Sequence, residues 1–207
     1  MRHTKVGATY LANSPEEQKE AYDDWAQSYE QDLCAMGYRL PAVAAAIFTR
    51  FVSLKAGPIL DAGCGGGIQT EPLKHVGYNR IIGIDFSPGM LDIAKSKKIY
   101  DELHCMALGQ PLNFPDETFS ATYSVGTITP KHAPASSFEE LIRVTKKEGL
   151  LIFSLRSDAG QEPEYPAALK HHTQTGHWQS LYATEGFAGM PYGEPNIFHR
   201  IHVYRRL

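Results

Sequence analysis

The segment Ile59-Leu-Asp-Ala-Gly-Cys-Gly-Gly-Gly67 decides the fold of this chain. Its apolar beginning predicts a short buried strand, and its glycines let the backbone turn sharply and let a ligand approach closely. Many nucleotide sites use a glycine-rich turn, so this motif alone is weak evidence. Asp85 ends the next predicted strand, where a carboxylate can accept hydrogen bonds from both hydroxyls of an adenosine ribose. Together the turn and Asp85 indicate a site for an adenosine-containing ligand.

Strands and helices alternate along the chain outward from this segment. The predicted strands are 58–63, 80–85, 103–108, 119–125, 149–155 and 199–205, and the predicted helices are 14–36, 41–54, 69–76, 87–100 and 137–145. This alternation is typical of an α/β fold with a doubly wound, mostly parallel sheet and helices on both faces. We expect seven strands and a single domain over residues 1–207.

The first predicted helix has a clear start and an aromatic face. In residues 14–17 a serine can cap the helix, a proline suits its first position, and a glutamate completes a capping box. Tyr22, Trp25 and Tyr29 follow on one face. We expect residues 14–36 to act as a lid that orders over the carboxyl edge of the sheet when ligand binds. The same stripe also suits a helix packed permanently against the core.

Composition narrows the function classes. The chain has 207 residues, 43% of them hydrophobic, and a net charge of -3. These values are ordinary for one globular domain and argue against general attraction to nucleic acid or acidic membranes. Cys34, Cys64 and Cys105 give neither a disulfide framework nor a zinc signature, so we expect a cytoplasmic protein. We also expect no bound metal, no nucleic-acid partner and no membrane span, and we leave the oligomeric state open.

Two residues separate the possible cofactors. Asp61 places a carboxylate at the end of the first strand, which suits an ammonium group and is unfavourable beside a pyrophosphate. A dinucleotide enzyme favours glycine at position 68, where this chain has Ile68. Both residues favour S-adenosylmethionine over a nicotinamide dinucleotide as the cofactor. A nicotinamide dehydrogenase is the alternative hypothesis.

Several motifs resemble those of a known enzyme superfamily. Residues 61–67, Asp-Ala-Gly-Cys-Gly-Gly-Gly, resemble motif I of class I methyltransferases, and residues 83–91 resemble the segment that follows it. The chain also resembles the Williams–Beuren syndrome region methyltransferase-like family, over residues 22–29, 108–119, 125–126 and 141–145. The resemblance spans residues 14–156, and the tail after Ser157 has no clear counterpart.

This resemblance implies an S-adenosylmethionine-dependent methyltransferase and assigns residues to its cofactor. The residues implied to contact S-adenosyl-L-methionine are Trp25, Tyr29, Asp61, Gly63, Cys64, Gly65, Asp85, Phe86, Met90, Leu108, Gly109, Gln110, Val125 and Gly126. Asp61 would lie near the ammonium group, Asp85 would hold the ribose, and Gln110 would lie near the adenine edge. Many relatives have an acidic residue at that last place, and an amide can also bond an adenine amino group.

The acceptor is less defined than the donor. Methyl transfer from a sulfonium needs mainly proximity, alignment and a desolvated nucleophile, so no dedicated catalytic residue is required. Tyr29 and His132 are the candidate bases for a nucleophile that must lose a proton. Residues 124–130 lack the Asn/Asp-Pro-Pro-aromatic run associated with methylation of nucleic-acid bases.

We therefore expect transfer to an N, O or S nucleophile on a small molecule. Residues 157–197 form the variable segment on the substrate side, rich in aromatic and histidine residues. Two alternatives stay open: a protein that binds S-adenosylmethionine without turnover, as a sensor or partner subunit, and a methyltransferase that acts on proteins.

Overall fold

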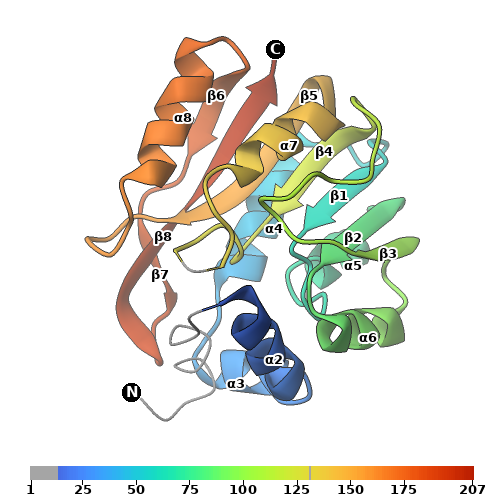
Figure 1. The fold of residues 1–207 in the computed structure, drawn as a ribbon, viewed down its shortest axis with the longest axis vertical. Coiled ribbons are helices and arrows are strands. Elements are labelled where there is room, and N and C mark those ends of the chain that lie inside the picture. Colours follow the sequence, from blue (N-terminus) through green and yellow to red (C-terminus); the bar gives the residue numbers. More distant parts are fainter. Residues whose placement is uncertain (1–13, 131) are drawn as a thin grey trace.

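Eight strands form one sheet at the centre of the protein, in a computed structural model that describes residues 14–130 and 132–207 (Figure 1). The strands are β1 (Ile59–Ala62), β2 (Ile81–Asp85), β3 (Glu102–Cys105), β4 (Phe119–Ser124), β5 (Thr145–Arg156), β6 (Trp178–Ala183), β7 (Phe187–Met190) and β8 (Glu194–Arg206). The helices are α2 (Pro15–Trp25), α3 (Tyr29–Ala35), α4 (Leu40–Phe51), α5 (Glu71–Val76), α6 (Pro88–Lys97), α7 (Ser137–Val144) and α8 (Glu164–Gln174).

The strand order is β3-β2-β1-β4-β5-β8-β6, with the short β7 paired to β8. β1 to β5 run parallel, and β8 runs antiparallel to β5 from Arg156↔His199 to Leu150↔Arg205. The doubly wound, mostly parallel sheet is thus confirmed, with the late strand β8 as an antiparallel member. The sheet has eight strands where seven were predicted, because residues 187–190 add a short strand beside β8.

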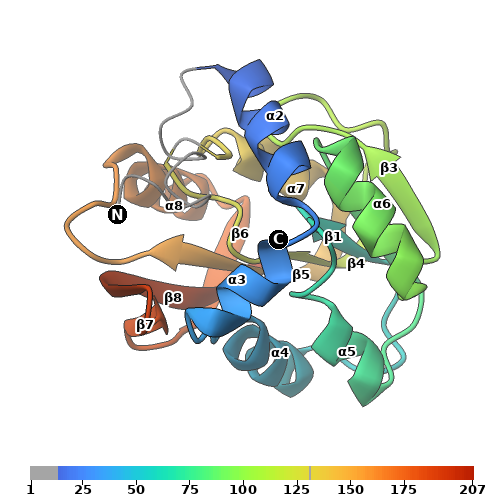
Figure 2. The same cartoon turned by 90° about the horizontal axis from the view of Figure 1, so that it is seen from below.

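Helices cover both faces of this sheet, and Figure 2 shows α4 and α5 on one face and α7 and α8 on the other. Each face has its own aromatic core. Phe48 of α4 packs edge-on against Tyr123 with ring centroids 5.4 Å apart, and Phe138 of α7 packs against Trp178 at the same distance. All four side chains are buried. Because both faces are covered, all four residues of β1 are buried, and so are five of the six residues of β4, including the polar Thr122 and Ser124.

The predicted helix over residues 14–36 is two helices in the structure, α2 and α3, which is a correction. Ser14 does cap α2, since its side chain accepts a hydrogen bond from the Glu17 N–H. The chain turns after Trp25, whose carbonyl accepts from the Ser28 N–H. Asp32 stabilises this turn, because its Oδ2 accepts both Trp25 Nε1–H at 2.7 Å and the Ser28 hydroxyl at 3.1 Å.

The tail contains more regular structure than its sequence indicated. Residues 157–197 form α8, β6, β7 and the start of β8, and these strands belong to the same sheet as motif I. Trp178 at the start of β6 is buried beneath α8, with its Nε1 3.1 Å from Thr173 Oγ1. None of the helices within the described residues has the length and apolar character needed to cross a lipid bilayer.

Candidate functional site

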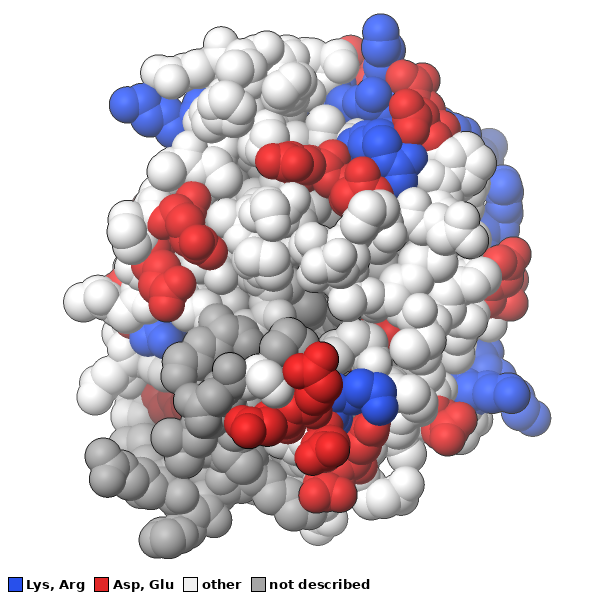
Figure 3. All heavy atoms as spheres, viewed as in Figure 1, with Lys and Arg blue, Asp and Glu red and all other residues white. Residues whose placement is uncertain are grey.

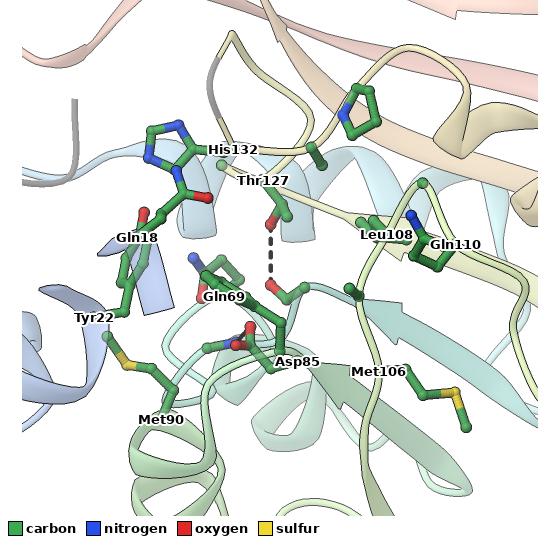
Figure 4. Close-up of a pocket in the computed structure, with 18 of the residues that line it drawn as sticks. Gln18, Tyr22, Gln69, Asp85, Met90, Met106, Leu108, Gln110, Thr127 and His132 are labelled. Carbon is green, nitrogen blue, oxygen red and sulfur yellow. Dashed lines mark hydrogen bonds between the residues drawn. The ribbon is translucent and has the colours of Figure 1, made fainter. Parts of the chain in front are cut away.

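A cavity of about 710 Å³ lies at the carboxyl ends of β1, β2 and β4, within the range of about 300–1,000 Å³ typical of small-molecule sites. α2 and α3 lie across this end of the sheet (Figure 1). In Figure 4, Gln18, Tyr22 and His132 lie on one side of the cavity, Leu108 and Gln110 lie on the opposite side, and Asp85 and Gln69 lie between them. The predicted site residues that line it are Tyr29, Gly63, Gly65, Asp85, Phe86, Met90, Leu108, Gly109, Gln110, Gly126 and His132.

The glycine turn forms the floor of the cavity. Gly63 has φ +80°, and a Cβ there would lie 2.2 Å from Cγ2 of Thr127, whose hydroxyl donates to the Gly63 carbonyl at 3.0 Å. Gly65 has φ +50°, and a Cβ there would meet no described atom within 4 Å. A side chain at either position would therefore strain the backbone, and one at Gly65 would also project into open space.

Two backbone N–H groups fix the orientation of the Asp85 carboxylate at the cavity. Its Oδ2 accepts the Gly65 N–H at 2.8 Å, and its Oδ1 accepts the Ser87 N–H at 2.9 Å. A carboxylate oxygen has two lone pairs, so each can accept one further hydrogen bond, from a ribose hydroxyl. Burial raises the pKa of Asp85 to about 6, in opposition to the hydrogen bonds from Ser87 and Gly65. The group is therefore mainly ionised at neutral pH.

Asp61 lies at the end of β1 and does not line the cavity among the described residues. Its Oδ2 accepts the Thr70 hydroxyl at 2.5 Å and the Tyr100 hydroxyl at 2.7 Å. Its Oδ1 is buried and has no hydrogen-bond partner among the described residues. Burial raises the pKa of Asp61 to about 6. An unpartnered buried carboxylate oxygen beside the glycine turn fits a cofactor that carries an ammonium group, such as S-adenosylmethionine.

The aromatic face of the N-terminal helices divides between the cavity and the core. Tyr22 and Tyr29 line the cavity, and the Tyr22 ring lies 5.8 Å from both Phe86 and His132. Trp25 is 3% exposed and lines only an adjoining space of about 60 Å³, with its indole N–H bound to Asp32. Tyr22 and Tyr29 therefore line the cavity, whereas Trp25, which the resemblance assigned to the cofactor, is absent from its lining.

Two other predicted residues lie behind the cavity wall. Cys64 and Val125 are fully buried and are absent from the cavity lining that the described residues form. Burial raises the pKa of the Cys64 thiol well above its usual range, and its Sγ lies 3.6 Å from the Gly65 carbonyl. Cys64 is therefore a packing residue in this conformation and not a thiolate nucleophile.

The two candidate bases differ in chemistry. Burial raises the pKa of Tyr29 well above its usual range, so its phenol holds its proton at neutral pH. Burial lowers the pKa of His132, so its imidazole is neutral at that pH. His132 Nδ1 lies 3.1 Å from the Pro130 carbonyl, which can only accept, and 3.2 Å from the Thr129 hydroxyl, which can accept as well. We therefore assign the proton to Nδ1, which makes Nε2 the basic nitrogen.

Sequence reasoning missed about half of the lining. The missed residues are Ser14, Gln18, Tyr22, Gln69, Met106, Ala107, Thr127, Ala133, Pro134, Glu162, Glu164 and Tyr165. Tyr22 had a usable signal, since it shares the stripe of Trp25 and Tyr29. Glu162 and Glu164 had none, because only the path of the chain after β5 brings them to the cavity.

Comparison with known proteins agrees with this geometry. A family model described as "Methyltransferase domain" matches residues 60–153. Methyltransferase-like protein 27 of Homo sapiens is 35% identical over 170 residues, which cover 78% of this chain and 68% of that protein.

Solved structures show the same fold. A Haloferax volcanii methyltransferase, in a complex with the activator Trm112, has a TM-score of 0.70 at 16% identity and covers 89% of this chain and 97% of that one. Magnesium protoporphyrin IX methyltransferase of Synechocystis, with S-adenosylmethionine bound, has a TM-score of 0.59 at 15% identity over 98% and 90% of the two chains. With S-adenosylmethionine as its methyl donor, the chain belongs to the class I methyltransferases, in the Williams–Beuren syndrome region methyltransferase-like family.

Proposed function

We propose that this methyltransferase acts on an N, O or S nucleophile of a small molecule. The observation that carries the proposal is the cavity itself, which holds about 710 Å³ and is covered on one side by α2 through Gln18 and Tyr22. A partly enclosed, aromatic-lined space of this size suits a small organic molecule better than a protein surface or a nucleic-acid strand.

Sheet topology divides this cavity between donor and acceptor. Most of the predicted cofactor contacts that line the cavity come from the ends of β1 and β2 and from the loop after β3, on one side of the strand order, with Tyr29 of α3 and Gly126 after β4 as the exceptions. A second half of the lining follows β4 and β5 and includes Thr127, His132, Glu162 and Tyr165, while Gln18 and Tyr22 reach the cavity from α2 and Gln69 lies beyond the glycine turn. We assign this second half to the acceptor, because it faces the donor half across the point where the strand order reverses.

The chemistry required of the chain is modest. S-adenosylmethionine, when bound, supplies an electrophilic methyl group on a sulfonium. Gly63 and Gly65 let the backbone approach the cofactor, and Asp85 holds its ribose. His132 accepts a proton through Nε2 where the nucleophile must lose one. Tyr29, whose pKa is raised by burial, stays protonated and helps to exclude water.

We further propose that residues 14–36 act as the lid of a single domain. Asp23 of α2 connects this segment to the N-terminus of α6, where its Oδ1 accepts the Ser87 hydroxyl and the Gly89 N–H. Despite partial burial, these hydrogen bonds and Lys19 lower the pKa of Asp23, so the contact persists at neutral pH. Glu30 of α3 adds an ion pair of 2.6 Å with Lys97 of α6. Trp25 and Leu33 also pack with Met190 of β7, so the lid would open by separating α2 and α3 from both α6 and β7.

We also propose a cellular location, and two alternative functions are to be tested against the proposed one. We place the protein in the cytoplasm, on the basis that its three cysteines are free thiols. The first rival binds S-adenosylmethionine without turnover, and the second methylates proteins.

The test is a transfer assay with S-adenosylmethionine that carries a labelled methyl group. The label is followed into the small-molecule, protein and RNA fractions of a cell extract, with Asp85→Ala protein as the control. We expect label in the small-molecule fraction with the wild type alone. Label only in protein or RNA would refute the proposal. Tight binding of S-adenosylhomocysteine with no transfer to any fraction would favour the protein without turnover.

A further inference from the structure

Among the described residues, the charged side chains that line the cavity are all acidic. Glu162 and Glu164 line it from the segment that joins β5 to α8, and Asp85 lies in the donor half. Among the lining residues that the structure describes, none is Lys or Arg. Arg156 lines the small adjoining space, and its charge is met by Asp158 at 2.6 Å.

Neither glutamate is neutralised by a neighbour. Glu162 and Glu164 are exposed, and neither forms an ion pair with another residue of the described chain. Among the described residues, Glu164 Oε1 accepts a long hydrogen bond of 3.4 Å from the Ala135 N–H, and the Glu164 side chain is also hydrogen-bonded to Tyr165. After burial itself, the charges of Glu164 and Glu162 are the next causes that raise the pKa of Tyr165, so both lie near its buried ring. Figure 3 shows acidic side chains beside the start of α8 and over α2.

The interior of the cavity offers a second feature that suits a cation. Gln69 is 4% exposed and lines the cavity, and its Oε1 is buried without a hydrogen-bond partner in the described part of the chain. The Nε2 of the same amide lies 3.4 Å from the Tyr38 hydroxyl, so Oε1 is the amide atom that can still accept a hydrogen bond. A buried carbonyl oxygen in this state needs an N–H or O–H group from a ligand.

Aromatic rings complete the environment. Tyr22 lies among Tyr29, Phe86 and His132, with ring centroids 5.8 to 6.2 Å from its own. Faces of such rings attract cations, and more strongly where water is excluded. An anionic acceptor would meet uncompensated carboxylates at the entrance and no described cationic side chain inside.

We propose that the acceptor is a small molecule with a protonated amine, which Glu162 and Glu164 attract at the entrance and which Gln69 Oε1 and the Tyr22 ring receive inside. This inference rests on the proposed small-molecule function and specifies its substrate class. The ammonium first gives one proton to Nε2 of His132. The nitrogen lone pair then forms the new N–C bond while the S–C bond breaks and its electron pair stays on sulfur. The products are the N-methylated ammonium, neutral S-adenosylhomocysteine and one proton, released from His132 to water.

The first test measures binding without turnover. Protein saturated with S-adenosylhomocysteine is titrated by calorimetry with 2-phenylethylamine and tryptamine, with their alcohols (2-phenylethanol and tryptophol), and with phenylacetate and indole-3-acetate. We expect at least one amine to bind tenfold or more tightly than its alcohol, and the carboxylates to bind more weakly still. Added salt should weaken amine binding alone, because it screens the charges at the entrance. Equal binding of an amine and its alcohol, stronger binding of a carboxylate, or no binding of either amine would overturn the inference.

The second test removes the charges while keeping the shape. The double variant with Glu162→Gln and Glu164→Gln should raise the Kd of the amine about tenfold, leave the Kd of the alcohol unchanged, and bind S-adenosylhomocysteine as the wild type does. Glu185→Gln is the matched control, because the Glu185 side chain is fully exposed and Glu185 is absent from the cavity lining. A double variant that binds amine as this control does would refute the role of the two glutamates.

Analysis of the reaction products tests the amine inference separately from the proposed small-molecule methyltransferase function. Mass spectrometry after incubation with S-adenosylmethionine should find methyl groups on nitrogen of the amines. Methylation of the alcohols or carboxylates on oxygen, with none on the amines, would leave the small-molecule function standing and would overturn the amine inference. No transfer to any of these compounds or to extract metabolites, with intact binding of S-adenosylhomocysteine, would count against the function itself.

Discussion

Asp85→Asn tests the assignment of the ribose to a single side chain. The change keeps the volume of the residue but replaces one carboxylate oxygen by an NH₂ group, which cannot accept a hydrogen bond. One charge-assisted hydrogen bond to a ribose hydroxyl is lost, at a cost of about 1.5–3 kcal/mol. Because about 1.4 kcal/mol is tenfold in affinity, the Kd for S-adenosylhomocysteine should rise about 10- to 150-fold.

The fold should tolerate this change, since two effects oppose each other. The new NH₂ group faces the N–H of Gly65 or Ser87, which leaves one buried donor without an acceptor at a cost of about 1–3 kcal/mol. The ionised carboxylate is itself unfavourable here, because a pKa raised from 3.8 to about 6 corresponds to about 3 kcal/mol at neutral pH. The melting temperature of the protein without ligand should therefore change by only a few degrees.

Calorimetric titration at two pH values gives the decisive measurement. Protonation of Asp85 competes with the ribose hydroxyls, so wild-type affinity should fall as the pH drops below about 6, by up to tenfold per pH unit. Asp85→Asn should lose part of this slope, and the rest belongs to Asp61, whose pKa is also raised to about 6. Asp92→Asn is the control, since Asp92 is exposed on α6. Wild-type affinity in a folded Asp85→Asn protein would refute the assignment.

Three further predictions concern the floor, the buried carboxylate and the lid. Gly63→Ala should lower both the melting temperature and the cofactor affinity, because its Cβ would collide with Thr127; wild-type values in both measurements would contradict the geometry. Asp61→Asn should change the pH dependence of stability. The pKa of Asp61 is about 6 in the folded protein and lower in the unfolded chain, so the wild type should lose stability as the pH rises. Between pH 4 and 7 its free energy of unfolding should fall by up to about 3 kcal/mol relative to that of the variant. Urea titrations that show the same difference in stability between the two proteins at both pH values would exclude this. Asp23→Asn should increase hydrogen exchange in residues 14–36, and S-adenosylhomocysteine should slow that exchange in the wild type; equal protection with and without ligand would favour a permanently packed segment.

The parts predicted well from the sequence are those where local signals agree with tertiary structure. The glycine turn, Asp85 and the helix that begins with Ser87-Pro88 are contiguous features, and the Ser87 side chain does accept from Met90 N–H as its cap position indicates. Apolar runs identified β1, β2 and the second half of β5, whose residues are mostly buried, whereas β3 is a partly exposed edge strand. The register of these strands then brings Asp61 beside Gly83.

The errors arose where distant residues decide local structure. A continuous helix was expected over residues 14–36, but Asp32 bonds both Trp25 and Ser28 and stabilises the break between α2 and α3. No periodic pattern in the sequence predicts α8. Its position depends on the burial of Tyr165 and Trp178 against the sheet. Such packing is a property of the assembled fold and leaves little trace in a short window of sequence.

The same contrast explains why the donor is known better than the acceptor. The donor site depends on one strand, one turn and the end of the next strand, which are about twenty residues apart, as in other folds of this type. The acceptor half instead combines α2, the segment after β4 and the segment after β5, which meet only at the carboxyl edge of the completed sheet. Selection for a new acceptor can change Glu162, Glu164 or Gln18 without disturbing the glycine turn. Substrate class must therefore be inferred from the charges and unpartnered groups that the folded chain brings together, such as Glu162, Glu164 and Gln69 Oε1, and those groups favour a cation.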